Sequence, residues 1–257
     1  MKYENSYVAF LDVLGFKKLV FSKSKEDKKK IESYFEIVKS EISSLKTVDT
    51  KQDINYILIS DSIIISIEQS QDETQKIENL RQLCIAVGKI QCKLALHNIW
   101  LRGAISSGET YIDSEEKQIV GAGYINAYLL EANHAIVPRV IIDNKIIYEL
   151  ELDSSDVLIN KLNRTQHQYL FQWNWYGNHM IKIEKDIPLF INYFHNIEND
   201  DLLMVMNNIQ ENIYSDVTLY KKFKWVSDYL ISYLYHKEKQ LGSSMAYHEY
   251  IRLLETL

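Results

Sequence analysis

The chain contains 257 residues, of which 46% are hydrophobic and 25% are charged. This is the balance of a globular protein and excludes a mostly disordered one. The 29 Lys and Arg against 35 Asp and Glu give a formal charge of −6, which argues against a dedicated binder of nucleic acid or anionic membranes, because such surfaces need clustered Lys and Arg. There is no run of 18 apolar residues and no apolar signal-peptide core, so we expect a cytoplasmic protein without membrane insertion.

The hydrophobic pattern changes its period several times along the chain. An apolar run at 8–16 is typical of a strand, and apolar residues at helical spacing follow it over 31–45. Branched aliphatic residues then flank Ser60-Asp61-Ser62, which predicts a hairpin with Asp61 at its tip. In chain order we predict a strand, a helix, that hairpin, a helix, a strand, a helix and a strand over residues 8–16, 31–45, 54–65, 77–94, 100–108, 121–131 and 137–142.

This order of elements predicts the fold class. A β-α-β-β-α-β series with one extra α-β unit is typical of a ferredoxin-like α+β core. Beyond residue 200 the apolar residues recur at helical spacing. We therefore predict a ferredoxin-like core followed by a C-terminal helical extension, with the boundary near residue 195.

Two acids interrupt the most strand-like stretches. Asp12 ends the first strand and Asp61 lies at the hairpin tip. In a ferredoxin-like sheet the first strand lies beside the central hairpin, so the two carboxylates can face each other. They would repel strongly unless a cation lay between them, and hard oxygen ligands suit Mg²⁺ or Mn²⁺ better than zinc. The alternative, which spacing alone leaves open, is an ordinary strand-end residue and an ordinary turn residue.

Gly15 follows Asp12 by three residues, where the first strand opens into a helix. Backbone N–H groups over 13–16 would form an anion-binding edge at that helix start. Metal-binding acids beside such an edge indicate a polyphosphate ligand.

Three motifs occur in the order found in class III nucleotidyl cyclases, namely Phe10–Phe16 (FLDVLGF), Ser60–Ser62 (SDS) and Leu101–Gly108 (LRGAISSG). In the detailed sequence around these motifs, the chain resembles the pyrimidine cyclases of the bacterial Pycsar antiphage system. That resemblance is strongest at Val8–Phe16, Ala127–Glu131 and Pro138–Ile142.

The resemblance covers residues 7–143, and more loosely 185–235. It implies a cyclase catalytic domain over 1–195 with a ferredoxin-like class III core, and a C-terminal helical extension over 196–257.

Carried over position by position, the resemblance implies a two-metal site. Asp12 and Asp61 would bind two divalent ions, Mg²⁺ or Mn²⁺, with help from the Val13 carbonyl. The β- and γ-phosphates would be held by the backbone of Leu14, Gly15 and Phe16.

The chain departs from the purine-using relatives at four positions. Where they read the base with a Lys and an Asp, it has Ile57 and about Gln118; where they hold ribose and phosphate with an Asn and an Arg, it has Ile125 and Leu129. Asn126 is one residue away from the expected Asn. These departures argue against an adenylyl or guanylyl cyclase and are shared by the pyrimidine branch.

Tyr56 and Arg102 are then the candidates for contacts to the base or the triphosphate. Tyr56 can stack on or hydrogen-bond a small base, and the Arg102 fork suits a carbonyl edge or a phosphate. The alternatives are an ordinary strand aromatic for Tyr56 and a structural ion pair for Arg102.

The resemblance implies that UTP or CTP is converted to the 3′,5′-cyclic monophosphate and pyrophosphate. The product would be a second messenger that a separate effector protein reads in antiphage defence. Class III enzymes pair two cores, so a homodimer with shared active sites is implied. Two alternatives stay open: a catalytically idle cyclase-like module that binds a nucleotide, and a conventional purine nucleotide cyclase.

Overall fold

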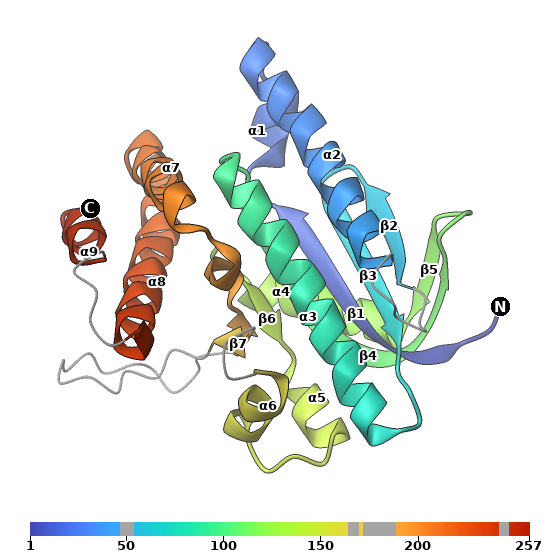
Figure 1. Cartoon of the computed structure of the whole chain (residues 1–257). Helices are drawn as coiled ribbons and strands as arrows, with labels where there is room; N and C mark the ends of the chain where they lie inside the picture. Colours follow the sequence, from blue (N-terminus) through green and yellow to red (C-terminus); the bar gives the residue numbers. More distant parts are fainter. Residues whose placement is uncertain (47–53, 164–169, 172–188, 242–246) are drawn as a thin grey trace.

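A mixed sheet forms the centre of the molecule, with helices on both faces and a helical group at one side (Figure 1). The structure is a computed structural model and describes residues 1–46, 54–163, 170–171, 189–241 and 247–257. The strands are β1 (Glu4–Val13), β2 (Asn55–Ile59), β3 (Ser62–Glu68), β4 (Leu101–Asp113), β5 (Gln118–Gly121), β6 (Val140–Ile142), β7 (Leu170–Phe171) and β8 (Phe190–Ile191). The helices are α1 (Phe16–Phe21), α2 (Lys25–Lys46), α3 (Glu73–Leu96), α4 (Ala122–His134), α5 (Asn144–Glu149), α6 (Ser155–Leu162), α7 (Leu202–Ser215), α8 (Val217–Leu241) and α9 (His248–Glu255).

The strand order is β2-β3-β1-β4-β6-β8-β7, with β5 paired to β4. Strand β1 is antiparallel to both β3 and β4, whereas β6 runs parallel to β4. The first four core strands with α2 and α3 therefore have the ferredoxin-like order, and α4 with β6 is the extra unit. The predicted α+β fold with C-terminal helices is confirmed.

Strand β1 separates two cores because its side chains alternate between the faces of the sheet. Tyr7 and Leu11 join the core beneath α2 and α3. Val8 and Phe10 face the other way and pack with Ala127 of α4. Asp12 follows Phe10 by two residues, so its side chain belongs to the α4 face.

A two-residue turn at Ser60-Asp61 joins β2 to β3, because Ile59 pairs with Ser62. Ser60 adopts a left-handed conformation, with φ 55°. The turn lies beside the end of β1, where the Val13 N–H donates to the Asp61 carbonyl over 3.2 Å. The hairpin thus places Asp61 next to Asp12.

The predicted end of the fourth core strand at Gly108 is wrong. Strand β4 continues to Asp113 and pairs with β5, whereas no strand was predicted between residues 108 and 121. Gly108 has a φ of 149°, which glycine adopts readily, and a Cβ atom there would lie 2.9 Å from the Gly123 nitrogen at the start of α4. The Asp113 carboxylate accepts hydrogen bonds from the N–H groups of Glu115 and Glu116 over 3.0 and 2.9 Å. These bonds stabilise the turn between the paired strands, and residues 110–121 are called the β4–β5 arm below.

The C-terminal helices share a core with one edge of the sheet. Trp100, just before β4, meets Phe223 of α8 edge to face at 5.2 Å, and Phe190 of β8 meets Tyr229 at 5.1 Å. This core crosses residue 195, and the predicted domain boundary there stays a prediction. Across the described ranges, no helix combines the length and the apolar character that crossing a membrane requires.

Candidate active site

The structure brings Asp12 and Asp61 together at the end of β1. Burial raises the pKa of Asp12, the positive charge of Arg102 opposes that rise, and the nearby carboxyl group of Asp61 raises the pKa further. The two carboxyl groups therefore lie close together at the end of β1. Close carboxyl groups at a partly buried position are the arrangement that a bound cation stabilises.

Arg102 faces Asp12 across the β1–β4 ladder. Its Nη2 and Nε atoms donate to Asp12 Oδ2 over 3.2 and 3.3 Å. The same Nε lies 2.9 Å from Oε1 of Glu131 on α4. The guanidinium thus lies between two carboxylates and pairs with both, as expected if Arg102 has the structural ion-pair role that the sequence analysis left open. A contact between Arg102 and a nucleotide stays a prediction.

Glu131 is the site residue that the sequence analysis missed. Its side chain is only 4% exposed and lies on the side of α4 that faces Arg102 of β4. Burial raises its pKa, while the positive charge of Arg102 lowers it. A signal was present in the sequence: Glu131 follows Ala127 by four residues and so shares the buried side of a helix that carries no other Asp, Glu, Lys or Arg.

The expected anion-binding edge is narrower than predicted. Gly15 has a left-handed conformation, with φ 77°, and starts α1. The N–H groups of Val13 and Leu14, however, donate to the carbonyls of Asp61 and Trp100 over 3.2 and 2.8 Å. The prediction that all four N–H groups over 13–16 face a ligand is therefore corrected, because the end of β1 uses two of them. Gly15 and Phe16 are left as the candidate donors, and Leu14 is not among them.

Tyr56 does not share a face with Asp12. It lies on β2 opposite Ile65 and packs against the core beneath α2 and α3. Its neighbour Ile57 fills the α4 face instead, beside Phe10. The interpretation of Tyr56 as a base contact gains no support from this placement.

The donor set at the acid pair fits a divalent ion. Two carboxylates and the Val13 carbonyl offer the hard oxygen atoms that Mg²⁺ and Mn²⁺ prefer, with water or phosphate oxygens completing the shell. A positive ion would also relieve the repulsion that raises the pKa of Asp12. In the part of the chain that the structure describes, no third His, Cys, Asp or Glu joins the two acids as a possible metal ligand.

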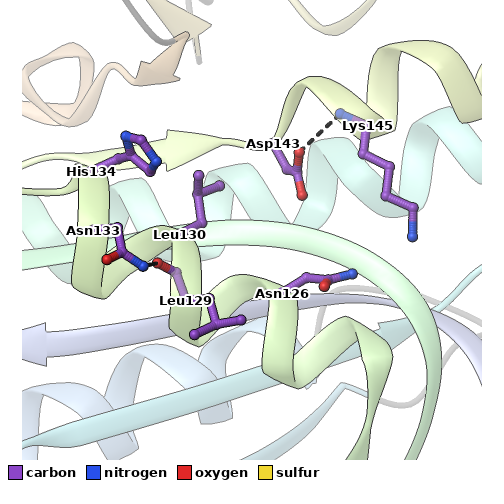
Figure 2. A pocket seen from close by; sticks show the side chains of 7 residues that line it. All are labelled: Asn126, Leu129, Leu130, Asn133, His134, Asp143 and Lys145. Carbon is purple, nitrogen blue, oxygen red and sulfur yellow. Dashed lines mark hydrogen bonds between the residues drawn. The ribbon is translucent and has the colours of Figure 1, made fainter.

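A separate pocket of about 330 Å³ lies between α4 and the start of α5 (Figure 2). Its lining residues are Asn126, Leu129, Leu130, Asn133, His134, Asp143 and Lys145. The Asp143 carboxylate accepts the backbone N–H of Lys145 over 2.9 Å. Asn126 points its amide toward the Ser107 carbonyl, 3.5 Å away. Asn126 thus borders this pocket, and the pocket contains neither Asp12 nor Asp61.

No protein-family model matches the chain, and no curated protein matches it. Solved structures of similar fold include the adenylyl cyclase CyaB from P. aeruginosa, with 12% identity, a TM-score of 0.45 and coverage of 74% of this chain and 94% of that one. The guanylyl cyclase Cya2 gives 13% identity, a TM-score of 0.38 and coverage of 74% and 92%. A class III adenylyl cyclase-like ATP-binding protein from Pseudomonas aeruginosa gives 10%, 0.41 and coverage of 61% and 36%. At TM-scores below 0.5 these likenesses leave the chemistry to be argued from the residues of the site.

Proposed function

We propose that this protein is a pyrimidine nucleotide cyclase that converts UTP, or CTP, to the 3′,5′-cyclic monophosphate and pyrophosphate. One observation carries the proposal: the carboxyl groups of Asp12 and Asp61 lie close together at the end of β1, and Arg102 pairs with Asp12 there. The resemblance of the three motifs to class III cyclases supports the reaction type. The role in antiphage defence, with a separate effector that reads the product, rests on the resemblance to Pycsar cyclases.

The residues of the site would act mainly by holding and orienting the substrate. Asp12 and Asp61, with the Val13 carbonyl, would hold two divalent ions, Mg²⁺ or Mn²⁺. When bound, such ions lower the pKa of the 3′-hydroxyl and neutralise charge on the leaving pyrophosphate. The N–H groups of Gly15 and Phe16 would orient the β- and γ-phosphates for an in-line attack at the α-phosphorus, and such positioning supplies a large part of catalysis.

The choice of a pyrimidine rests on what stands at the base-reading positions. Ile57 is 1% exposed and packs beside Val8 and Phe10, so it offers no polar atom to a purine. Gln118 is exposed at the start of β5 and carries no charge. The Lys and Asp pair that the resemblance associates with purine recognition is therefore absent from these two positions.

The test is an assay of the full chain with each of the four ribonucleoside triphosphates and Mn²⁺, with the products resolved by mass. We expect cyclic UMP or cyclic CMP together with pyrophosphate. Asp61→Ala should reduce turnover by about 10³-fold or more, equivalent to roughly 4 kcal/mol of lost transition-state stabilisation. The matched control is Asp153→Ala, at an exposed loop residue, which should keep wild-type turnover. Near-normal turnover of Asp61→Ala would contradict the assignment.

A second candidate, a catalytically idle module that binds a nucleotide, is favoured by one observation. Ile125 and Leu129 stand where the resemblance implies ribose- and phosphate-binding side chains, and they are 47% and 49% exposed and apolar. The same assay distinguishes the candidates. Nucleotide binding without any product supports the idle module, and cyclic AMP or cyclic GMP supports a purine cyclase.

The proposal includes a homodimer with shared active sites. Four exposed apolar residues lie along one side of α4 or just beyond its end, at Ile125, Tyr128, Leu129 and Ile136. Exposed apolar residues that cluster on one side of a helix are typical of a protein–protein contact, so this cluster supports a dimer interface. Light scattering on the active protein should give twice the chain mass, and an active monomer would contradict the shared site.

A further inference from the structure

Arg102 stands between two carboxylates but gives its hydrogen bonds to only one of them. Its Nε and Nη2 atoms both donate to Asp12 Oδ2, over 3.3 and 3.2 Å. Glu131 Oε1 lies 2.9 Å from that Nε, yet within the described residues no donor reaches this oxygen with hydrogen-bonding geometry. A nearly fully buried carboxylate oxygen is therefore ion-paired with Arg102 but receives no hydrogen bond of good geometry, because the guanidinium directs its N–H groups at Asp12.

Binding of a cation at the acid pair would change this balance. A divalent ion needs carboxylate oxygens of Asp12 as ligands, and it repels a guanidinium that holds one of them. Leaving a buried acceptor without a donor is costly, so the Arg102 N–H groups have a favourable alternative at Glu131. The short Nε–Oε1 distance means that a small rotation of the Arg102 side chain is sufficient.

We propose that Glu131 is a positioning residue that serves as a second acceptor for Arg102. In this proposal, which rests on the function proposed above, Arg102 moves its hydrogen bonds from Asp12 to Glu131 when Asp12 and Asp61 take up a divalent cation. Asp12 is thereby released as an oxygen ligand. Arg102 stays in the site, held against α4, with its positive charge still facing the acid pair.

The test is the affinity for Mn²⁺ without nucleotide, measured on the full chain by titration calorimetry. Glu131→Gln should weaken Mn²⁺ binding about tenfold, because Arg102 then keeps its hold on Asp12. With Arg102→Met in the same chain, Glu131→Gln should change the affinity by less than about twofold, because no guanidinium competes for Asp12. If Glu131→Gln weakens Mn²⁺ binding equally in the wild type and in Arg102→Met, the proposal is overturned. Glu131 would then affect Mn²⁺ affinity only by its charge or by its contribution to folding, and not by holding Arg102.

Further variants separate this inference from the function on which it rests. Asp61→Asn removes a proposed ligand and should abolish Mn²⁺ binding. A matched control is Glu149→Gln, because Glu149 is a half-buried acid that pairs with Lys145 on α5; it should bind Mn²⁺ as the wild type does. Wild-type protein without Mn²⁺ affinity would overturn the proposed function together with the inference. Mn²⁺ binding that Glu131→Gln leaves unchanged would overturn the role of Glu131 alone.

Discussion

Asp12 and Asp61 place two carboxyl groups together at a partly buried position, and this has a cost when no cation is bound. The neighbouring charge of Asp61 adds to the burial that raises the pKa of Asp12. Asp61→Asn removes the repulsion and keeps a residue that turns tolerate. We expect the metal-free variant to be more stable by about 0.5–1 kcal/mol, as is common where function opposes stability.

Urea unfolding in the presence of a chelator measures this effect as a higher midpoint at unchanged slope. Added Mn²⁺ should then stabilise the wild type but not the variant, because the variant lacks one of the two proposed ligands. Asp72→Asn is the control, since Asp72 caps α3 through the Gln75 N–H at 2.8 Å and Asn caps equally well. A lower midpoint for metal-free Asp61→Asn would contradict a repulsive pair.

The sequence allowed the closeness of Asp12 and Asp61 to be predicted, but not the other partners of these acids. Asp12 and Asp61 interrupt runs of apolar strand residues, where a charge needs a reason. The pairing of Glu131 with Arg102 is recognisable only once α4 is laid on β4, because the two residues come from different elements. Tyr56 was singled out by residue type alone, although the period of two along β2 places it and Ile57 on opposite faces, and Ile57 packs beside Phe10 on the α4 face.

At the scale of elements, strongly periodic segments were predicted and polar ones were not. The long helices and the apolar strands occur in the predicted order because burial on one face or both imposes a clear pattern. The β4–β5 arm was missed because its outer part carries mixed polar residues around Gly108 and Asp113. Its pairing is set by contact with β2 and α4, which a local pattern does not encode.

Helix α4 carries Glu131, and its approach to β4 depends on Gly123. A Cβ atom at Gly123 would lie 2.6 Å from Thr110 Oγ1 and 3.1 Å from Val8 Cγ2. Gly123→Ala should therefore push the start of α4 away from the sheet and cost about 1–2 kcal/mol. In a chain of this size this lowers the melting temperature by about 2–8 °C.

Thermal unfolding followed by circular dichroism measures that shift. The control is Ala122→Ser, which adds an atom at the neighbouring exposed position and should change stability by less than about 0.5 kcal/mol. An unchanged melting temperature for Gly123→Ala would show that α4 is not held by close contact at its start.

At the scale of the whole molecule, Tyr229 of α8 joins the C-terminal helices to the sheet edge. Its hydroxyl donates to Asn192 Oδ1 over 2.6 Å and accepts the Phe194 N–H over 3.3 Å. Its ring stacks on that of Phe194 with the centroids 4.8 Å apart. Tyr229→Phe would leave a buried donor and a buried acceptor without this partner, at a cost of about 1–3 kcal/mol.

Because one core crosses residue 195, we expect the helices and the sheet to unfold together. In urea, helix content by circular dichroism and tryptophan fluorescence should give coincident midpoints for the wild type, and Tyr229→Phe should lower both midpoints equally. Tyr235→Phe is the control, because Tyr235 is exposed and its hydroxyl donates to Glu255 at the surface. Two separate transitions, of which Tyr229→Phe shifts only that of the C-terminal helices, would instead mean that residues 196–257 fold as an independent extension. The stability of the candidate metal site would then not depend on these helices.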